Sequence, residues 1–388
     1  MLDLFEPQLL GATVPLSNRI VMPSMTRTRT SEGDVPNELM AMYYGQRAGA
    51  GLIVTEATDV APSSKGYAWT PGIYNENQLQ GWRLVTNEVH RNGGTIFVQL
   101  WHVGRMAHPS LMPNGEAPWG VTEQKAEHSD VFAHGEDGKL HYMRAGTPRR
   151  LGTDEVSALV GTFAQAFANV RQVRFDGVEL HAANGYLFEQ FTNSVHNTRT
   201  DRYGGGSVED RTRFLMEVVD AAIRELGPGR VGVRLSPFGE YNSIPADPLA
   251  EETLLYVCEQ LGRRGVAYIN LLYQLLPPGN MESAEFKELH IDHAVLAKVR
   301  AVFPGAIIWC GGFTNREKAQ AALDTGLVDL IAMGRPYIGN PDLVERLRHR
   351  WPLVEADRST YYTRRGEVGF TDFAAYADAD ASTARSAG

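Results

Sequence analysis

Short runs of apolar and often β-branched residues recur along the chain, and segments with helical periodicity separate them. The runs are brief and mostly bounded by glycine, which is typical of strands buried on both faces of a parallel sheet. Eight runs fit this description, at residues 19–22, 52–55, 95–100, 177–180, 231–235, 266–270, 306–310 and 328–333. The pattern therefore predicts eight buried parallel strands.

Amphipathic helical segments lie between these runs, the clearest at residues 75–92, 154–174, 207–226 and 248–264. Thr153 stands where an N-cap is expected for the second segment, although Val156 at its third position rules out a full capping box. Gly227 and Gly265 stand where the last two segments would end, as C-terminal caps do. Repeated alternation of strand and helix predicts an α/β fold, the (β/α)₈ TIM barrel.

Three segments explain why the chain is longer than the roughly 250 residues of a typical barrel. Residues 7–17 precede the first strand and are predicted to form a short N-terminal hairpin over the bottom of the barrel. Residues 103–152 follow the third strand without strong periodicity, and we expect a long loop or lid there, a capping insertion. Residues 374–388 are small and polar and are expected to form a flexible tail, so residues 1–373 would make one domain.

A doubly wound open sheet is the alternative architecture. It would place a glycine fingerprint directly after the first strand. That turn instead reads Met22-Pro23-Ser24-Met25-Thr26, and the glycine pairs follow the seventh and eighth strands. The barrel is therefore favoured.

Composition and charge narrow the class of protein further. Hydrophobic residues make up 43% of the chain, enough for a large core. The net charge of -9 argues against nonspecific nucleic-acid binding. No apolar stretch is long enough to span a membrane, and the first residues lack the pattern of a signal peptide, so a cytoplasmic protein is expected.

The chain has two cysteines, Cys258 and Cys310, which are far apart in sequence. Two thiolates cannot hold a four-cysteine iron–sulfur cluster, and no Cys-x-x-Cys pair is present to bind a metal. We expect both to be buried, inert thiols.

Three polar side chains follow the fourth predicted strand, at a tight Asn-Gly turn. His181 and Asn184 can both donate hydrogen bonds to one oxygen, and Tyr186 can hold or give a proton. Barrel enzymes build their sites at the carboxyl ends of strands. The pattern alone leaves open whether these groups are catalytic or merely satisfied structural residues.

Glycines also follow the seventh and eighth strands, as Gly311-Gly312 and Gly334, with Arg335 beside the latter. Barrels often bind a phosphate between these two loops through backbone N–H groups, and an arginine adds a bidentate partner. Two interpretations stay open, a phosphorylated ligand or tight turns with Arg335 in a structural ion pair.

Polar residues within the strand pattern point to a ligand too. Thr26, Gln99 and Arg234 would be costly inside a barrel unless each found a partner. A flavin ring would suit all three, because Gln99 and Thr26 can match its pyrimidine edge and Arg234 can stabilise the negative charge of the reduced ring.

At these residues the chain resembles the Old Yellow Enzyme family, the FMN-dependent ene-reductases. The resemblance extends from Leu4 to about Phe373, and several motifs occur in the family's order. These motifs are residues 18–22, 66–74, 99–105, 181–187, 199–205 and 334–336.

The resemblance implies a TIM barrel that binds FMN at its C-terminal face. The flavin ring would be held by Thr26, Ala57, Gln99 and Arg234, the phosphate by Gly312, Gly334 and Arg335, and Tyr361 would lie near the dimethylbenzene edge. The substrate pocket would be lined by Tyr67, Trp101 and Tyr362. His181 and Asn184 would bind the carbonyl or nitro oxygen, and Tyr186 would donate the proton.

The implied reaction passes hydride from NADPH or NADH through flavin N5 to the β-carbon of an α,β-unsaturated carbonyl compound or a nitroalkene. Nitrate esters and nitroaromatics are further possible oxidants. The implied partners are these small molecules, with no nucleic acid and no membrane, in a monomer or homodimer. A 2-hydroxy-acid oxidase and a non-redox barrel that binds a phosphorylated ligand are the rival interpretations.

The chain departs from the family pattern in three places. Ser24 stands at a usual proline position, which puts local flavin contacts in doubt. An extra glycine in 204–206, with Asp210 in place of asparagine, predicts a looser loop. Arg364 and Arg365 replace a glycine run near the expected cofactor entrance, where they would either favour the 2′-phosphate of NADPH or form a solvated basic loop.

Overall fold

Eight parallel strands pair in a closed ring in the computed structural model, which describes residues 2–272, 292–362 and 366–376. The ring closes because the last strand pairs with the first and the third pairs with the fourth. Its strands are β3 (Ile20–Met22), β4 (Leu52–Val54), β6 (Ile96–Trp101), β11 (Gly177–Ala182), β12 (Val231–Leu235), β13 (Tyr268–Leu272), β14 (Ala306–Cys310) and β15 (Leu330–Ala332). The predicted barrel is confirmed, and each strand overlaps a predicted run, although β6, β11 and β13 extend one or two residues beyond theirs.

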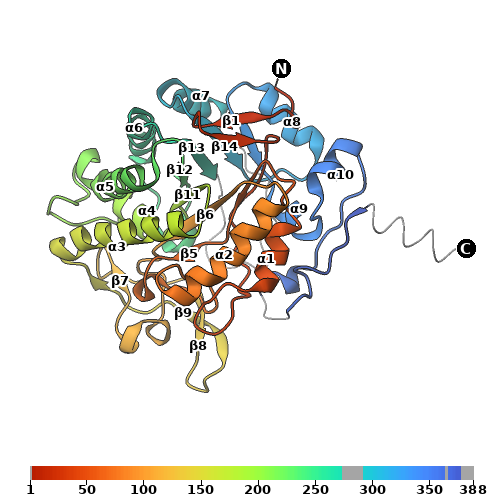
Figure 1. Ribbon diagram of the computed structural model, residues 1–388. Coiled ribbons are helices and arrows are strands. Elements are labelled where there is room, and N and C mark those ends of the chain that lie inside the picture. The colour runs from red at the N-terminus through yellow and green to blue at the C-terminus, as the bar shows by residue number, and fades with distance from the viewer. Residues whose placement is uncertain (1, 273–291, 363–365, 377–388) are drawn as a thin grey trace, which may run out of the picture.

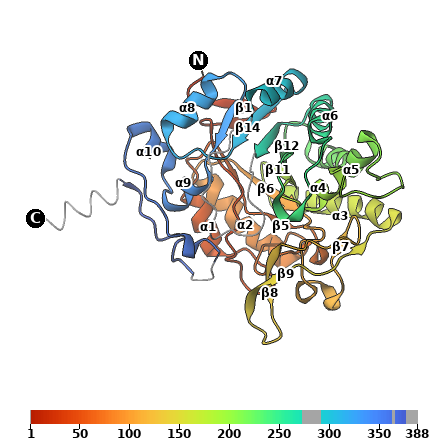
Figure 2. The ribbon, with the colours of Figure 1, turned by 180° about the vertical axis from the view of Figure 1, so that it is seen from behind.

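Helices surround the ring of strands, as two opposite views show (Figures 1 and 2). They are α1 (Glu38–Gly45), α2 (Glu76–Arg91), α3 (Thr153–Gln172), α4 (Leu187–Thr192), α5 (Val208–Leu226), α6 (Ala250–Arg263), α7 (His293–Val302), α8 (Arg316–Asp324), α9 (Gly334–Gly339) and α10 (Leu343–His349). In the part of the chain that the structure describes, no helix is both long and apolar enough to cross a bilayer.

A phenylalanine cluster fixes the short helix α4 against its neighbours. The ring of Phe188 in α4 lies 5.2 Å from Phe163 in α3 and 5.1 Å from Phe214 in α5, between ring centroids. All three side chains are fully buried, and burial of each contributes about 1.5–3 kcal/mol. Because α4 directly follows the turn that carries Asn184 and Tyr186, this packing also fixes the position of that turn.

The helix ends follow the predicted signals, with one correction. Gly227 caps α5 at φ +88°, and Gly265 follows α6 at φ +69°. Thr153 is not an N-cap, because α3 begins with it. The carboxylate of Glu155 instead accepts a 2.7 Å hydrogen bond from the N–H of Gly152, so the cap is formed by the side chain three residues on.

The N-terminal hairpin is present as predicted. Strands β1 (Gln8–Leu10) and β2 (Val14–Leu16) pair antiparallel. The hydroxyl of Thr13 donates to the carbonyl of Gly229, two residues before the start of β12. The hairpin therefore lies at the amino-terminal end of the strands, the bottom of the barrel.

The insertion at residues 103–152 is more regular than the predicted loop. It contains an antiparallel hairpin of β8 (Asp130–His134) and β9 (Leu140–Arg144), which projects from the body of the barrel (Figure 1). Two further strands, β7 (Trp119–Gly120) and β10 (Arg149–Arg150), pair parallel. The alternation of buried Val131 and Ala133 with exposed neighbours is too short to stand out as a period in the sequence.

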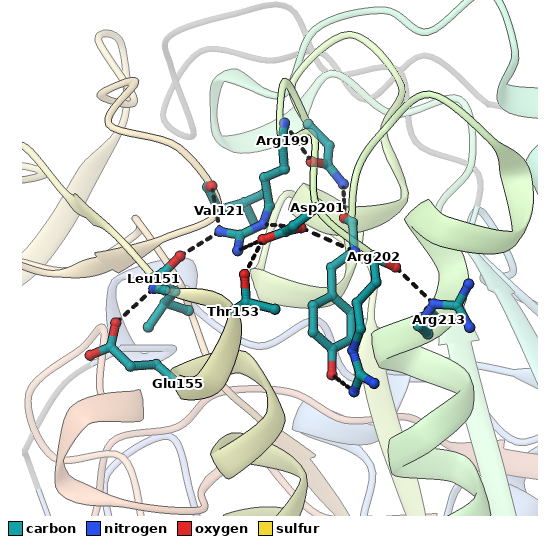
Figure 3. Close-up of polar contacts among 11 residues, drawn as sticks. Val121, Leu151, Thr153, Glu155, Arg199, Asp201, Arg202 and Arg213 are labelled. Carbon is teal, nitrogen blue, oxygen red and sulfur yellow. Dashed lines mark hydrogen bonds and ion pairs between the residues drawn. The ribbon is translucent and has the colours of Figure 1, made fainter.

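Arg199 fastens this insertion at two points, Val121 near its middle and Leu151 near its end (Figure 3). Its buried guanidinium donates to the carbonyls of Val121 and Leu151, at 3.3 and 2.5 Å, and pairs with Asp201. Asp201 also accepts a 2.6 Å hydrogen bond from Thr153, at the start of α3. The ion-paired side chains of Arg199 and Asp201, both in the 199–205 motif, thus join the insertion and α3.

Two of the three glycines at residues 204–206, where we predicted a looser loop, lie tightly against neighbouring backbone. A Cβ at Gly204 would lie 2.4 Å from the carbonyl oxygen of Arg199, and one at Gly205 would lie 2.1 Å from that of Asn197. Only Gly206 has open space around it. Close backbone approach explains the first two glycines, and the extra one is accommodated at the surface.

We predict that Arg199→Ala lowers the free energy of unfolding by about 3 kcal/mol, because it removes a fully buried charge from its partners. Arg202→Ala is the matched control, since that side chain is half exposed and should contribute less than about 1 kcal/mol. Urea denaturation of both variants measures the difference. Equal midpoints would show that Arg199 does not hold the insertion in place.

The end of the described chain is anchored rather than free. Residues 374–376 lie within the predicted flexible tail, yet Arg346 of α10 donates to the carbonyl of Ala374 and the ring of Tyr376 stacks on Trp351 at 4.6 Å. The rest of the predicted tail, and the Arg364-Arg365 pair, lie outside the described residues.

Candidate active site

The side chains of His181, Tyr186 and Trp101 meet at the carboxyl ends of β6 and β11. The ring centroid of Tyr186 lies 4.9 Å from that of His181 and 5.0 Å from that of Trp101, edge to face in both cases. Trp101 and His181 are nearly parallel, with centroids 6.1 Å apart. Three residues that the sequence marked separately therefore form one buried aromatic and polar cluster.

The turn that carries Asn184 is fixed from several sides. Asn184 and Gly185 adopt φ values of +59° and +72°, left-handed conformations that asparagine and glycine tolerate best. The N–H of Asn184 donates to the Ser236 hydroxyl at 2.7 Å, and the N–H of Gly185 donates to the Glu189 carboxylate at 2.5 Å. Asn242 donates its side-chain amide to the carbonyl of Asn184 at 2.8 Å.

Glu189 and Ser236 were not predicted from the sequence. The Ser236 hydroxyl donates to the Glu189 carboxylate at 3.1 Å, so the two act together under the turn. Burial raises the pKa of Glu189 to about 8, although the N–H of Gly185 opposes the shift. Glu189 lies in the first turn of α4, four residues after Gly185, and this short spacing is the signal that could have identified it.

Burial and nearby charges determine the protonation states of His181 and Tyr186. Burial, reinforced by the positive charge of Arg234, lowers the pKa of His181, so its imidazole is neutral at neutral pH and keeps one N–H to donate. Its Nδ1 atom is buried without a partner in the described structure. Burial also raises the pKa of Tyr186, with hydrogen bonds from Tyr67 and Asn242 acting in the opposite direction. Tyr186 therefore stays protonated.

The predicted pocket residues lie around this cluster. Tyr67 stacks on Trp101 with centroids 6.0 Å apart, and Tyr362 is 44% exposed. Tyr361 and Tyr362 contact each other edge to face at 6.4 Å. The two belong to the C-terminal segment, whose described residues 360–362 and 366–371 lie beside the loop that follows the first strand.

Two arginines that we did not predict hold this segment through its backbone. Arg27 donates to the carbonyls of Tyr361 and Gly369, at 3.2 and 2.7 Å, and Arg29 donates to that of Thr360 at 2.8 Å. Arg47 adds a hydrogen bond to the carbonyl of Phe370 at 3.3 Å. The aromatic pair is thus positioned by side chains more than three hundred residues away in sequence.

The interior of the barrel holds a polar network. Glu179 is fully buried and accepts hydrogen bonds from Gln99 at 2.6 Å and Asn270 at 3.0 Å. Ser24 donates to the amide oxygen of Gln99 at 2.7 Å. Gln99 is left with one amide hydrogen and one lone pair, which suit the alternating donors and acceptors of a pyrimidine edge. Ser24, which stands where the family usually has proline, therefore orients the Gln99 side chain through this hydrogen bond.

Arg234 is only partly satisfied by the protein. It donates to the carbonyl of Ser24 at 3.3 Å and approaches the sulfur of Cys310 at 3.9 Å, while its Nε atom is buried without a partner. Among the described residues it forms no ion pair with a carboxylate, so a buried positive charge remains to be balanced. A flavin that gains negative charge on reduction fits this position.

The two glycine loops lie side by side, because Cys310 pairs with Ala332 where β14 and β15 end. Gly312 is exposed at φ +75° with no atom near a would-be Cβ, and Gly334 begins α9. Arg335 is exposed, and its positive charge acts on the hydroxyl of Tyr361. Open backbone N–H groups beside an arginine fit a phosphate, so both ends of an FMN would find suitable residues.

The remaining predicted groups fall as follows. Ala57 is buried beside Trp101, and Thr26 is half-buried. Cys258 and Cys310 are buried and free, as predicted, and burial raises the pKa of both thiols. In the described part of the chain, no group of three or more histidine, cysteine or acidic residues is placed to hold a metal ion.

Sequence comparisons identify relatives over nearly the whole chain. The profile of the NADH:flavin oxidoreductase / NADH oxidase family matches residues 3–353. The chain is 40% identical over 374 residues to 12-oxophytodienoate reductase 1 of Oryza sativa subsp. japonica, covering 96% of this chain and 93% of that protein. It is 38% identical over 380 residues to chanoclavine-I aldehyde reductase of Penicillium roqueforti (strain FM164), covering 96% of each.

Solved structures agree with these matches. Morphinone reductase superposes with a TM-score of 0.90 at 41% identity, covering 97% of both chains. Its complex with tetrahydroNAD gives 0.88 at 42% identity, covering 96% of this chain and 97% of that one. An Old Yellow Enzyme homologue from Zymomonas mobilis gives 0.85 at 34% identity, covering 96% and 99%.

Proposed function

Since the chain belongs to the NADH:flavin oxidoreductase / NADH oxidase family, we propose that it is an FMN-dependent ene-reductase, with residues 1–373 as one catalytic domain. Membership makes it a flavin-dependent oxidoreductase with a nicotinamide reductant, and leaves the rival interpretations without support. The substrates that we propose are α,β-unsaturated carbonyl compounds and nitroalkenes, with nitrate esters and nitroaromatics as further oxidants.

One observation carries the proposal, the edge-to-face contact of His181 and Tyr186 at the carboxyl end of β11, on either side of the fixed turn that carries Asn184. A neutral histidine and an asparagine on a fixed turn can donate to one oxygen and stabilise the enolate-like charge that develops there. Tyr186, held protonated, can give its proton to the α-carbon. The site supplies an oxygen acceptor and a proton donor, the two groups that ene reduction needs.

The bound flavin would supply hydride to the β-carbon. Gln99 and Arg234 would hold the pyrimidine part of its ring, with Thr26 and Ala57 beside them. Gly312, Gly334 and Arg335 would hold the phosphate, and Tyr361 would contact the opposite edge. Arg234, whose buried Nε atom has no hydrogen-bond partner among the described residues, would balance the negative charge of the reduced ring.

The names of the relatives support a carbonyl substrate. Each names a carbonyl compound, an oxo acid, a morphinone or an aldehyde, as what the protein reduces. NADPH or NADH is the proposed reductant, and the complex of morphinone reductase with tetrahydroNAD supports a nicotinamide reductant.

An anaerobic titration tests the proposal. The purified protein should show a flavin spectrum that bleaches when NADPH or NADH is added and returns when cyclohexenone is added. Return of the oxidised band shows both half-reactions. A flavin that bleaches and stays reduced with cyclohexenone, nitrostyrene and maleimide alike would contradict ene reduction while keeping the family assignment.

A further inference from the structure

A buried carboxylate is bonded directly to the wall of the substrate pocket. Asp59 is 1% exposed and ends the short strand β5 (Thr58–Asp59), where it pairs in register with Trp101 of β6. Its Oδ1 accepts a 2.7 Å hydrogen bond from the indole Nε1 of Trp101. Its Oδ2 accepts a 2.8 Å hydrogen bond from the hydroxyl of Thr70. Both oxygens are therefore engaged.

Asp59 occupies an expensive position for a carboxylate. Among the described residues it forms no ion pair, and the nearby Lys65 is paired at 2.6 Å with Asp34. Burial raises the pKa of Asp59 to about 8, which Lys65 partly opposes and Asp34 reinforces. An apolar side chain would fill this space at a lower free-energy cost, so we looked for a role of the Asp59 carboxyl group in its hydrogen bonds. Of the two hydrogen bonds that Asp59 accepts, the one from Trp101 connects it to the proposed substrate pocket.

Trp101 transmits this constraint to the catalytic residues. Its indole ring stacks over His181 and meets Tyr186 edge to face, with Tyr67 stacked at 6.0 Å. Rotation of the indole would change the space beside His181 and Tyr186, where a substrate ring must lie. An indole N–H that is tied to a carboxylate cannot rotate without leaving both groups unsatisfied.

We propose that Asp59 is a positioning residue that locks Trp101 in one orientation and so determines which substituents on the ring of a substrate fit the pocket. This inference rests on the proposed function, because it takes the space beside His181 and Tyr186 as the substrate pocket. Asp59 acts through Trp101 and touches no reacting atom.

Three substitutions separate the hydrogen bond from the charge and from general packing. Asp59→Asn keeps an oxygen for the indole N–H and turns its amide toward Thr70, whose hydroxyl can also accept. Asp59→Leu keeps a similar volume and removes the bond. Thr70→Val is the matched control, since it removes the other hydrogen bond to the same carboxylate and leaves the indole bond in place.

The first measurement needs no turnover. Phenol and the wider 2-naphthol are titrated into the oxidised holoenzyme, and the change in the flavin spectrum gives the Kd of each. We expect Asp59→Leu to shift the ratio of the two Kd values by about tenfold. Asp59→Asn and Thr70→Val should stay within about twofold of the wild type. An unchanged ratio in Asp59→Leu, or an equal shift in Thr70→Val, would overturn the proposal.

The second measurement asks whether Asp59 acts through Trp101. In a Trp101→Phe background no indole N–H remains, so Asp59→Leu should have no further effect on the ratio. The ratio of the kcat/KM values for cyclohexenone and 3-methylcyclohexenone should behave in the same way: Asp59→Leu should change it in the wild-type background and leave it unchanged in the Trp101→Phe background. Independent effects of the two substitutions would contradict the tether. If the wild type reduces no enone, the proposed function fails, whereas the phenol ratios still decide the tether.

Discussion

Tyr186→Phe is expected to slow reoxidation of the reduced flavin by an enone by about 10²–10⁴-fold, the usual contribution of a positioned general acid. Reduction of the flavin by NADPH should stay within about twofold of the wild type, since no proton from Tyr186 is needed in that step. Stopped-flow absorbance under anaerobic conditions measures the two half-reactions separately. An equal loss in both would refute the role of Tyr186 as proton donor.

The pH dependence of the same reaction offers a second readout. Burial holds the pKa of Tyr186 above its ordinary value, so the proton-bearing form persists below that raised pKa. The wild-type reoxidation rate should therefore not fall through loss of this proton up to about pH 10, the ordinary pKa of tyrosine. Tyr67→Phe keeps the aromatic ring and removes one hydrogen bond to the Tyr186 oxygen, so it is the control for that bond. A fall in rate centred below pH 9 would place the acid elsewhere.

Replacing His181 and Asn184 together with alanine is expected to weaken the binding of phenol, a mimic of the enolate, by about 10²-fold or more. Each lost hydrogen bond to a charged oxygen contributes about 1.5–3 kcal/mol. Flavin absorbance during a phenol titration gives the Kd. His181→Asn keeps an N–H donor and should retain part of the affinity. A double variant that binds phenol as tightly as the wild type would move the oxygen site away from these residues.

The strands and the turn with the proposed catalytic residues were accessible from the sequence because their signals are local. Each barrel strand lies in or overlaps a mostly apolar run, and His181, Asn184 and Tyr186 lie within six residues of one another. The hairpin of the insertion was missed because its alternation covers only a few residues. Thr153 was misread because the cap is provided by Glu155, whose partner is a glycine N–H.

The residues that orient the site were out of reach for a different reason. Gln99 meets Glu179 across 80 positions of sequence, and Asp59 meets Trp101 across 42. A carboxylate or arginine that serves a distant backbone group has no periodicity and no fixed spacing. Such partners follow only from the closure of the barrel, which brings strands of known identity into a specific register.

The hold of Arg27, Arg29 and Arg47 on the C-terminal segment has a consequence for biosynthesis. These arginines leave the ribosome early, whereas the carbonyls that they bind belong to residues 360–371. During translation the guanidinium groups therefore stay hydrated until the rest of the barrel has been synthesised. The tyrosine pair beside the pocket can therefore take its place only after nearly all of the strands have been made. A nascent chain stalled before this segment would carry His181 and Tyr186 in a site without its outer wall.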